Sequence, residues 1–161
     1  MKIGVISDTH IPEKAQNIPK EIYSAFKDVE LILHAGDLST LDVVKSLEKI
    51  CPVKAVYGNM DNPQTRKVLK DKEIIQINNF KIGLIHGGGH PSKLIDFAKN
   101  AFPQKLDVIV FGHSHAPLNE RMSGVLFFNP GSPTDTVFSP YRSYGILEIN
   151  DDIKAKIVRL P

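Results

Sequence analysis

The order of apolar and polar positions predicts alternating strands and helices over the first two thirds of the chain. Short apolar runs indicate three buried strands, at residues 2–6, 30–34 and 53–57. The segments between them place apolar residues three or four positions apart, as amphipathic helices do, at residues 19–27 and 40–50. This alternation is typical of an α/β domain.

The second of these helices has a predicted start and a predicted apolar face. Ser39 or Thr40 can accept a hydrogen bond from the first free backbone amides, so we expect one of them to be the N-cap. Leu41, Val44 and Leu47 lie three positions apart and are expected to face inward.

The pattern becomes richer in strands after residue 70. Two apolar runs, 73–77 and 81–85, flank a hairpin-like turn. A helix capped by Ser92 is expected to run to about Phe102. Further strands are expected at residues 107–111, 125–129, 143–149 and 153–160, with no convincing helix among the last three. We therefore expect one domain, residues 1–161, with two packed sheets and helices outside.

Composition and charge give no indication of a nucleic-acid-binding, membrane or disulfide-linked protein. The 161 residues include 42% hydrophobic and 24% charged positions, which is ordinary for a globular domain. Twenty basic residues nearly balance 18 acidic ones, so no bulk attraction to nucleic acid or membrane is expected. Cys51, the single cysteine, cannot form an internal disulfide and is interpreted as a small core residue. With no signal-peptide pattern and no membrane-length apolar run, we expect a cytoplasmic location.

Residues with metal-binding chemistry follow five of the predicted strands. They are Asp8, His10, Asp37, Asn59, His86, His113 and His115. Ligands bind at the carboxyl ends of strands in α/β sheets, so these side chains are expected to converge. Mixed carboxylate and imidazole donors suit Mn, Fe, Zn, Ni or Co. Each motif alone could be a simple turn, but their joint occurrence at five strand ends favours a metal site.

Glycines adjoin several of these residues. They are Gly36, Gly58, Gly87 and Gly112. We expect the backbone to turn sharply there or to approach a bound anion closely.

Taken together, these motifs resemble the series found in the calcineurin-like metallophosphoesterase superfamily. The matching segments are Asp8-Thr9-His10, Gly36-Asp37, Gly58-Asn59-Met60-Asp61, His86-Gly87 and Gly112-His113-Ser114-His115. Asn129-Pro130-Gly131-Ser132 is similar to a signature of the small single-domain phosphodiesterase branch of bacteria and archaea. The resemblance implies an α-β-β-α fold, in which two mixed β-sheets form a sandwich flanked by helices.

The resemblance also implies two divalent metal ions per chain and a small phosphodiester substrate. The implied ligands are Asp8, His10 and His115 for one ion, Asn59, His86 and His113 for the other, and Asp37 between them. A hydroxide that bridges the ions would attack phosphorus. Asp37, Asn59 and His86 are the expected catalytic residues. Mn²⁺ is the expected ion, although the same donors accept Ni²⁺, Fe²⁺, Zn²⁺ or Co²⁺.

Met60 is a departure from the wider superfamily that this chain resembles. Many members of that superfamily carry a proton-donating histidine at this position. Methionine cannot donate a proton, which argues against strong activity on esters with poor leaving groups. The small phosphodiesterase branch also lacks that histidine, so Met60 does not argue against catalysis. His90 could replace the donor or be a simple loop histidine.

Other polar residues have two open interpretations. His34 could support a ligand carboxylate or be a satisfied core histidine. Asp61 could orient Asn59 or stabilise its turn. Arg142 could meet a phosphate oxygen or stay solvated. The basic stretch at residues 66–72 is interpreted as a solvated helix or loop.

Two rival functions remain at this stage. A retromer subunit with a similar fold is an interaction scaffold, so fold alone does not decide function. A purely structural metal site is the second rival, although seven shared ligands would leave positions open for substrate. A homo-oligomer is compatible with the sequence.

Overall fold

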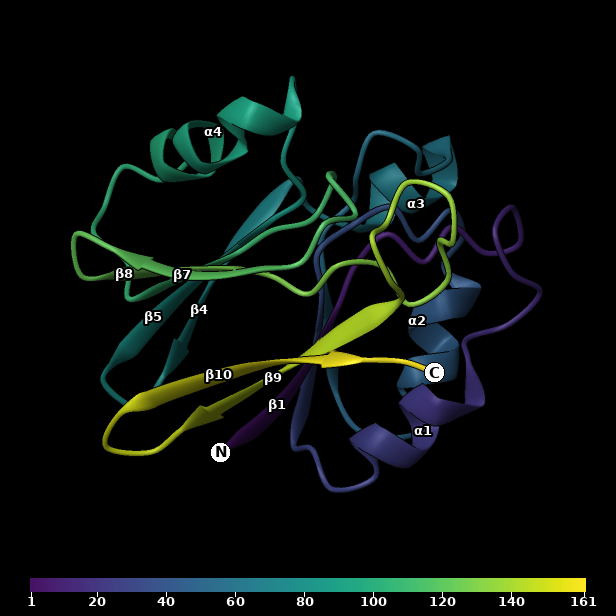
Figure 1. The fold of residues 1–161 in the computed structure, drawn as a ribbon, viewed down its shortest axis with the longest axis horizontal. Helices are drawn as coiled ribbons and strands as arrows, with labels where there is room; N and C mark the ends of the chain where they lie inside the picture. The colour runs from purple at the N-terminus through teal and green to yellow at the C-terminus, as the bar shows by residue number, and fades with distance from the viewer.

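Two five-stranded mixed sheets form the centre of the protein, seen in a computed structural model that describes residues 1–161 (Figure 1). The first sheet has the order β10-β9-β1-β2-β3: β1 Lys2–Ile6, β2 Leu31–His34, β3 Val53–Ala55, β9 Ser143–Ile149 and β10 Ile153–Arg159. The second has the order β4-β5-β6-β8-β7: β4 Lys72–Ile77, β5 Phe80–Ile85, β6 Val108–Val110, β7 Leu118–Met122 and β8 Val125–Asn129. Strands β1, β2 and β3 are parallel, as are β5, β6 and β8.

Helices cover the outer faces of both sheets. The covering helices are α1 Lys20–Phe26, α2 Asp42–Leu47 and α4 Leu94–Asn100. Two shorter helices are α3 Pro63–Val68 and the 3₁₀ helix η1 Pro91–Lys93. Figure 1 shows α4 over the second sheet and α1 and α2 beside the first. The expected α-β-β-α sandwich is therefore confirmed. None of the helices combines the length and apolar character needed to cross a membrane.

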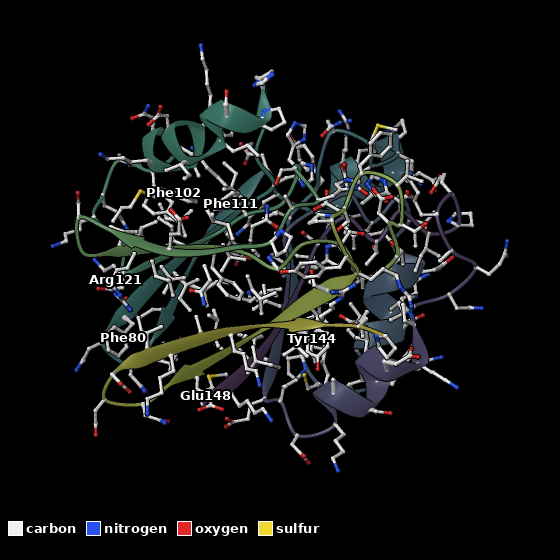
Figure 2. All side chains as sticks on the ribbon, in the orientation of Figure 1. Phe80, Phe102, Phe111, Arg121, Tyr144 and Glu148 are labelled. Atoms are coloured by element: carbon white, nitrogen blue, oxygen red, sulfur yellow. The ribbon has the colours of Figure 1, made fainter.

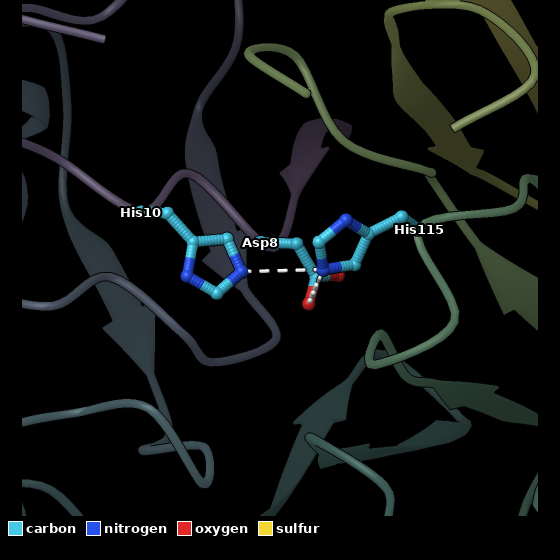
Figure 3. A group of neighbouring side chains, drawn as sticks. All are labelled: Asp8, His10 and His115. Carbon is cyan, nitrogen blue, oxygen red and sulfur yellow. Dashed lines mark hydrogen bonds and ion pairs between the residues drawn. The ribbon is translucent and has the colours of Figure 1, made fainter. Parts of the chain in front are cut away.

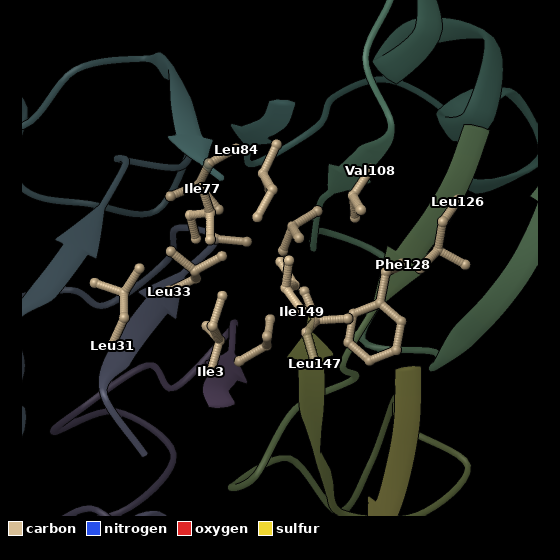
Figure 4. Close-up of a cluster of buried hydrophobic side chains, with 14 of the residues drawn as sticks. Ile3, Leu31, Leu33, Ile77, Leu84, Val108, Leu126, Phe128, Leu147 and Ile149 are labelled. Carbon is tan, nitrogen blue, oxygen red and sulfur yellow. The ribbon is translucent and has the colours of Figure 1, made fainter. Parts of the chain in front are cut away.

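The core has three apolar clusters, one between each pair of adjacent layers. Between the sheets, residues such as Ile3, Leu33 and Phe128 interdigitate (Figure 4). Phe102 and Phe111 belong to the cluster between α4 and the second sheet (Figure 2). Burial on both faces explains why the central strands β2 and β6 are apolar throughout, apart from His34 at the end of β2.

The start of α2 differs from the expectation. Leu41, rather than Ser39 or Thr40, is the N-cap residue, and no side chain caps the helix. Ser39 belongs to the preceding loop, with φ of +75°. The buried residues of α2 are Val43 and Leu47, four positions apart, whereas Leu41 and Val44, also expected to face inward, are only half-buried.

Two short elements were not predicted. α3 begins at Pro63 after Asn62, whose side chain accepts a hydrogen bond from Thr65 N at 2.8 Å. Only Thr65 of this helix is buried, so it has no apolar stripe. The middle of edge strand β7 is exposed and polar, which hides its strand character. Cys51, expected in the core, is only half-buried.

Candidate metal centre

The seven candidate ligands meet where carboxyl ends of strands from both sheets approach each other. Asp8 and His10 follow β1, Asp37 follows β2, Asn59 lies in the loop after β3, His86 follows β5, and His113 and His115 lie in the loop after β6. Four of the seven side chains are buried: Asp8, His10, Asp37 and His86. His113 and His115 are half-buried, and Asn59 is exposed. The structure brings together every residue that the strand-end pattern singled out.

Asp8, His10 and His115 form a first group of donors (Figure 3). Nε2 of His10 lies 3.2 Å from Nε2 of His115. The same His115 nitrogen is 3.4 Å from Oδ1 of Asp8. Two imidazole nitrogens and a carboxylate oxygen that face one point can hold a single divalent cation.

Asp37 connects this group to a second one. Its Oδ2 lies 3.2 Å from Nε2 of His86 and 3.7 Å from Nε2 of His10. Oδ1 of Asn59 is 3.1 Å from the same His86 nitrogen and 3.0 Å from Nδ1 of His113. Asp8 also approaches the second group, since its Oδ1 is 4.0 Å from His86 Nε2.

Hydrogen bonds outside the cluster orient three of the imidazoles. His86 Nδ1 donates to Ala35 O at 2.8 Å, and His113 Nε2 donates to Gly89 O at 3.1 Å. These carbonyls can only accept, so in the neutral ring the other nitrogen directs its lone pair into the cluster. The donor set and its tautomers therefore fit divalent cations.

Asp135 provides the corresponding partner for His115, and the sequence reasoning missed it. Its buried carboxylate contacts Nδ1 of His115 through Oδ2. Oδ1 accepts from Val137 N at 2.8 Å and lies 3.6 Å from Lys14 Nζ. The available signal was the position of Asp135 three residues after Ser132, at the end of the Asn-Pro-Gly-Ser motif.

Asp61 fixes the loops that carry Asp37 and Asn59. Its carboxylate accepts from the backbone N–H groups of Gly58 at 2.7 Å, Asp37 at 3.0 Å and Ser39 at 2.7 Å. It therefore stabilises the turn and does not contact the Asn59 side chain. Burial raises the pKa of this carboxyl above its ordinary value, although the backbone donors oppose that effect.

Arg66 supports the same loop from outside. Its guanidinium donates to Asp61 O at 2.8 Å and also contacts Asn59 O. Arg66 is exposed on α3, which agrees with the expected solvated helix, and its guanidinium has this supporting contact in addition.

Two histidines outside the cluster have structural roles. His34 is a satisfied core histidine: its Nδ1 accepts from Gly36 N at 3.2 Å, and its Nε2 lies 3.0 Å from Thr9 Oγ1. Burial lowers its pKa to about 3, so the ring is neutral. His90 accepts from Ser92 N at 3.3 Å and caps η1, which favours the loop-histidine interpretation.

Arg142 does not line the cleft beside the cluster. Its guanidinium donates to the C-terminal Pro161 O. The structure thus favours neither phosphate contact nor full solvation for this side chain.

Backbone strain is concentrated at the cluster. Five of the seven candidate ligands have positive φ: Asp8 at 54°, His10 at 43°, Asp37 at 54°, His113 at 70° and His115 at 57°. Each such residue costs roughly 1–3 kcal/mol and persists only where its surroundings impose it. Strain of this kind is characteristic of functional sites.

The glycines beside the ligands provide space for side chains. A Cβ at Gly112 would lie 2.7 Å from Asp8 Oδ2. A Cβ at Gly58 would overlap Asp37 Oδ1 and lie 2.7 Å from His86 Cδ2. The close approach expected at these positions is therefore to the ligands themselves.

The buried charges in the cluster balance one another. Burial alone would raise the pKa values of Asp8 and Asp37, but His115 and His86 beside them hold both below their ordinary value. Burial likewise opposes protonation of His86, yet the Asp37 and Asp8 carboxylates raise its pKa to about 9. In the metal-free protein, a proton on His86 thus supplies positive charge that a bound metal ion would otherwise supply.

A cleft of about 580 Å³ opens directly above the candidate ligands. His10, Asp37, Asn59, His113 and His115 form its floor, while Lys14, Met60 and Phe138 are among the other lining residues. A cleft of this size suits a small organic ligand.

Comparison with known proteins places this site in context. A family model described as a calcineurin-like phosphoesterase superfamily domain matches residues 1–152. A probable metallophosphoesterase of Methanothermobacter thermautotrophicus is 42% identical over 135 residues, covering 83% of this chain and 78% of the relative. A phosphodiesterase of Methanocaldococcus jannaschii is 32% identical over 145 residues, covering 81% of this chain and 83% of the relative.

Solved structures with the same fold include Vps29 of Entamoeba histolytica in complex with Zn²⁺. It matches with a TM-score of 0.76 and 28% identity over 99% of each chain. Proteins similar to this chain therefore include both phosphoesterases and a sorting protein, and the site must decide between their functions.

Proposed function

Because this chain belongs to the calcineurin-like phosphoesterase superfamily, we propose that it is a dinuclear metal-dependent phosphodiesterase acting on small substrates. The position of Asp37 carries the proposal. Its Oδ2 lies between His86 Nε2 at 3.2 Å and His10 Nε2 at 3.7 Å, so one carboxylate is shared by two donor groups. A shared carboxylate is what a pair of closely spaced ions requires. The likeness to a phosphodiesterase of M. jannaschii supports a diester substrate.

The residues of the chain bind and orient. Bound ions, with Mn²⁺ the expected metal, would supply a nucleophile at neutral pH and positive charge for the phosphoryl oxygens. The proposed ligands are Asp8, His10 and His115 for one ion, Asn59, His86 and His113 for the other, and Asp37 for both. Ala35 O and Asp135 hold the imidazoles of His86 and His115 in the tautomer that binding needs.

A non-catalytic interaction scaffold is the second candidate, supported by the likeness to Vps29. The complete set of ligands argues against it. Residues with positive φ and buried charges lower the stability of the fold, and an interaction scaffold would have no use for them in a cleft.

The test is hydrolysis of bis-p-nitrophenyl phosphate by metal-stripped protein, before and after addition of Mn²⁺. This diester has a good leaving group and does not require the proton donor that Met60 cannot supply. We expect activity with metal only, its loss in Asp37→Ala, and its retention in Asp42→Asn, a surface control. Full activity of Asp37→Ala, or none in folded wild-type protein with Mn²⁺, Ni²⁺, Co²⁺ or Zn²⁺, would contradict the proposal.

A further inference from the structure

An exposed aromatic ring lies beside the candidate metal centre. Phe138 lines the cleft and is 71% exposed. Its ring meets the His115 ring edge-on, with centroids 6.4 Å apart. Lys14 Nζ lies 4.8 Å from the centre of the Phe138 ring.

The backbone of Phe138 is held close to the candidate metal ligands. Asp135, which orients His115, also accepts a hydrogen bond from Phe138 N at 3.3 Å. The next residue, Ser139, donates from Oγ to His115 O at 2.8 Å. One small loop therefore holds both the candidate ligand and the exposed ring.

A single exposed apolar side chain is common on protein surfaces. Phe138 differs because hydrogen bonds hold its backbone at the wall of a cleft whose floor would bind phosphate. Met60, also a cleft residue, is 61% exposed. A phosphate held at the floor would direct its ester group along these walls, where an aromatic ring favours a planar partner.

Building on the proposed phosphodiesterase function, we propose that Phe138 is a stacking platform for the base of a nucleoside esterified to the phosphate. Lys14 is held 3.6 Å from Asp135 and lies over the ring, and both side chains line the cleft. Phe138 therefore offers an aromatic surface inside the cleft, next to a positive charge. The substrate class is then a nucleotide diester rather than an alkyl or sugar diester.

Binding of two phosphomonoesters to the Mn²⁺-loaded protein tests this by calorimetry. Adenosine 5′-monophosphate and ribose 5-phosphate share the phosphate and the sugar and differ in the base. Stacking of one base on an aromatic side chain should make the adenosine compound bind roughly 5- to 150-fold more tightly. Phe138→Ala should reduce this ratio to near one, and Phe138→Trp should keep it. Val137→Ala, an equally exposed neighbour outside the cleft, should match the wild type.

Equal affinities in the wild type, no binding of either compound, or an unchanged ratio in Phe138→Ala would overturn the inference. Because the assay measures binding, its result is separate from that of the hydrolysis assay. Base-dependent binding without any hydrolysis of the nitrophenyl diester would overturn the proposed function and the substrate class, and would leave Phe138 as a base-binding residue. Hydrolysis without base preference would overturn this inference alone.

Discussion

Asp135 contacts Nδ1 of His115 across 20 residues of sequence, and its carboxylate is buried. The pair links the last part of the chain to the loop after β6. Burial alone would raise the pKa of Asp135, but backbone donors, first among them Val137 N, and His115 lower it to about 2. The carboxylate is therefore ionised and keeps the Nδ1 proton of His115 on its own side of the ring.

Asp135→Asn should weaken metal binding by roughly 10- to 100-fold, the usual effect of losing such a partner. An asparagine oxygen can still accept from the backbone N–H groups of Val137 and Phe138, so the loop should persist. Competition with a chromogenic chelator measures the affinity. Asp42→Asn, an exposed aspartate on α2, is the matched control. Unchanged affinity in Asp135→Asn would show that His115 needs no orienting partner.

Gly58→Ala should abolish binding of the second ion, because the new Cβ would overlap Asp37 Oδ1. The backbone of the loop cannot move away easily, since Asp61 holds Gly58 N at 2.7 Å. Gly88→Ala is the control, as its Cβ would make only a 3.4 Å contact with Phe97. Metal content by mass spectrometry of the purified proteins measures the effect. Two ions per chain in Gly58→Ala would show that the loop can yield.

The sequence located the candidate ligands because residues with metal-binding chemistry are concentrated at the predicted strand ends. Asp8, Asp37 and His86 come within three residues of the ends of apolar strands, so the strand pattern located them. Asp135 and Asp61 act on the same ligands through contacts that no local periodicity encodes, and Arg66 does so from a helix without an apolar stripe. Such supporting contacts depend on how loops meet in space, which explains why only the fold revealed Asp135 and the role of Arg66 and decided between the two interpretations of Asp61.

Met60→His should increase activity on diesters with poor leaving groups. Met60 lines the cleft, and its backbone N–H donates to Asp37 Oδ1 at 2.8 Å whichever side chain is present. A histidine there can donate a proton, and general acids commonly contribute about 10²- to 10⁴-fold.

The measurement compares kcat/KM for diphenyl phosphate with that for bis-p-nitrophenyl phosphate. We expect the first to rise at least about tenfold and the second to change less, because nitrophenolate needs little protonation. Met60→Leu keeps the apolar wall without a donor and should show neither effect. A similar gain in Met60→Leu would assign the change to cleft shape.

Metal binding should release protons at neutral pH. In the metal-free protein the Asp37 and Asp8 carboxylates outweigh the effect of burial and raise the pKa of His86 to about 9, so this ring is protonated at pH 7. Its Nε2 must lose that proton to bind a cation. The pKa of His115 is raised in the same direction, again against the effect of burial. Affinity should therefore increase as the pH rises toward 9, by about tenfold per pH unit for each proton released.

Calorimetry at pH 7 in buffers of different ionisation enthalpy counts these protons. The binding enthalpy should vary linearly with the buffer enthalpy, with a slope of about one proton or more per chain. His90→Ala should give the same slope, because His90 caps η1 outside the cluster. A slope of zero in the wild type would mean that His86 is neutral in the metal-free protein. In that case the negative charges of Asp8 and Asp37 in the metal-free protein would be balanced by a group other than a protonated His86.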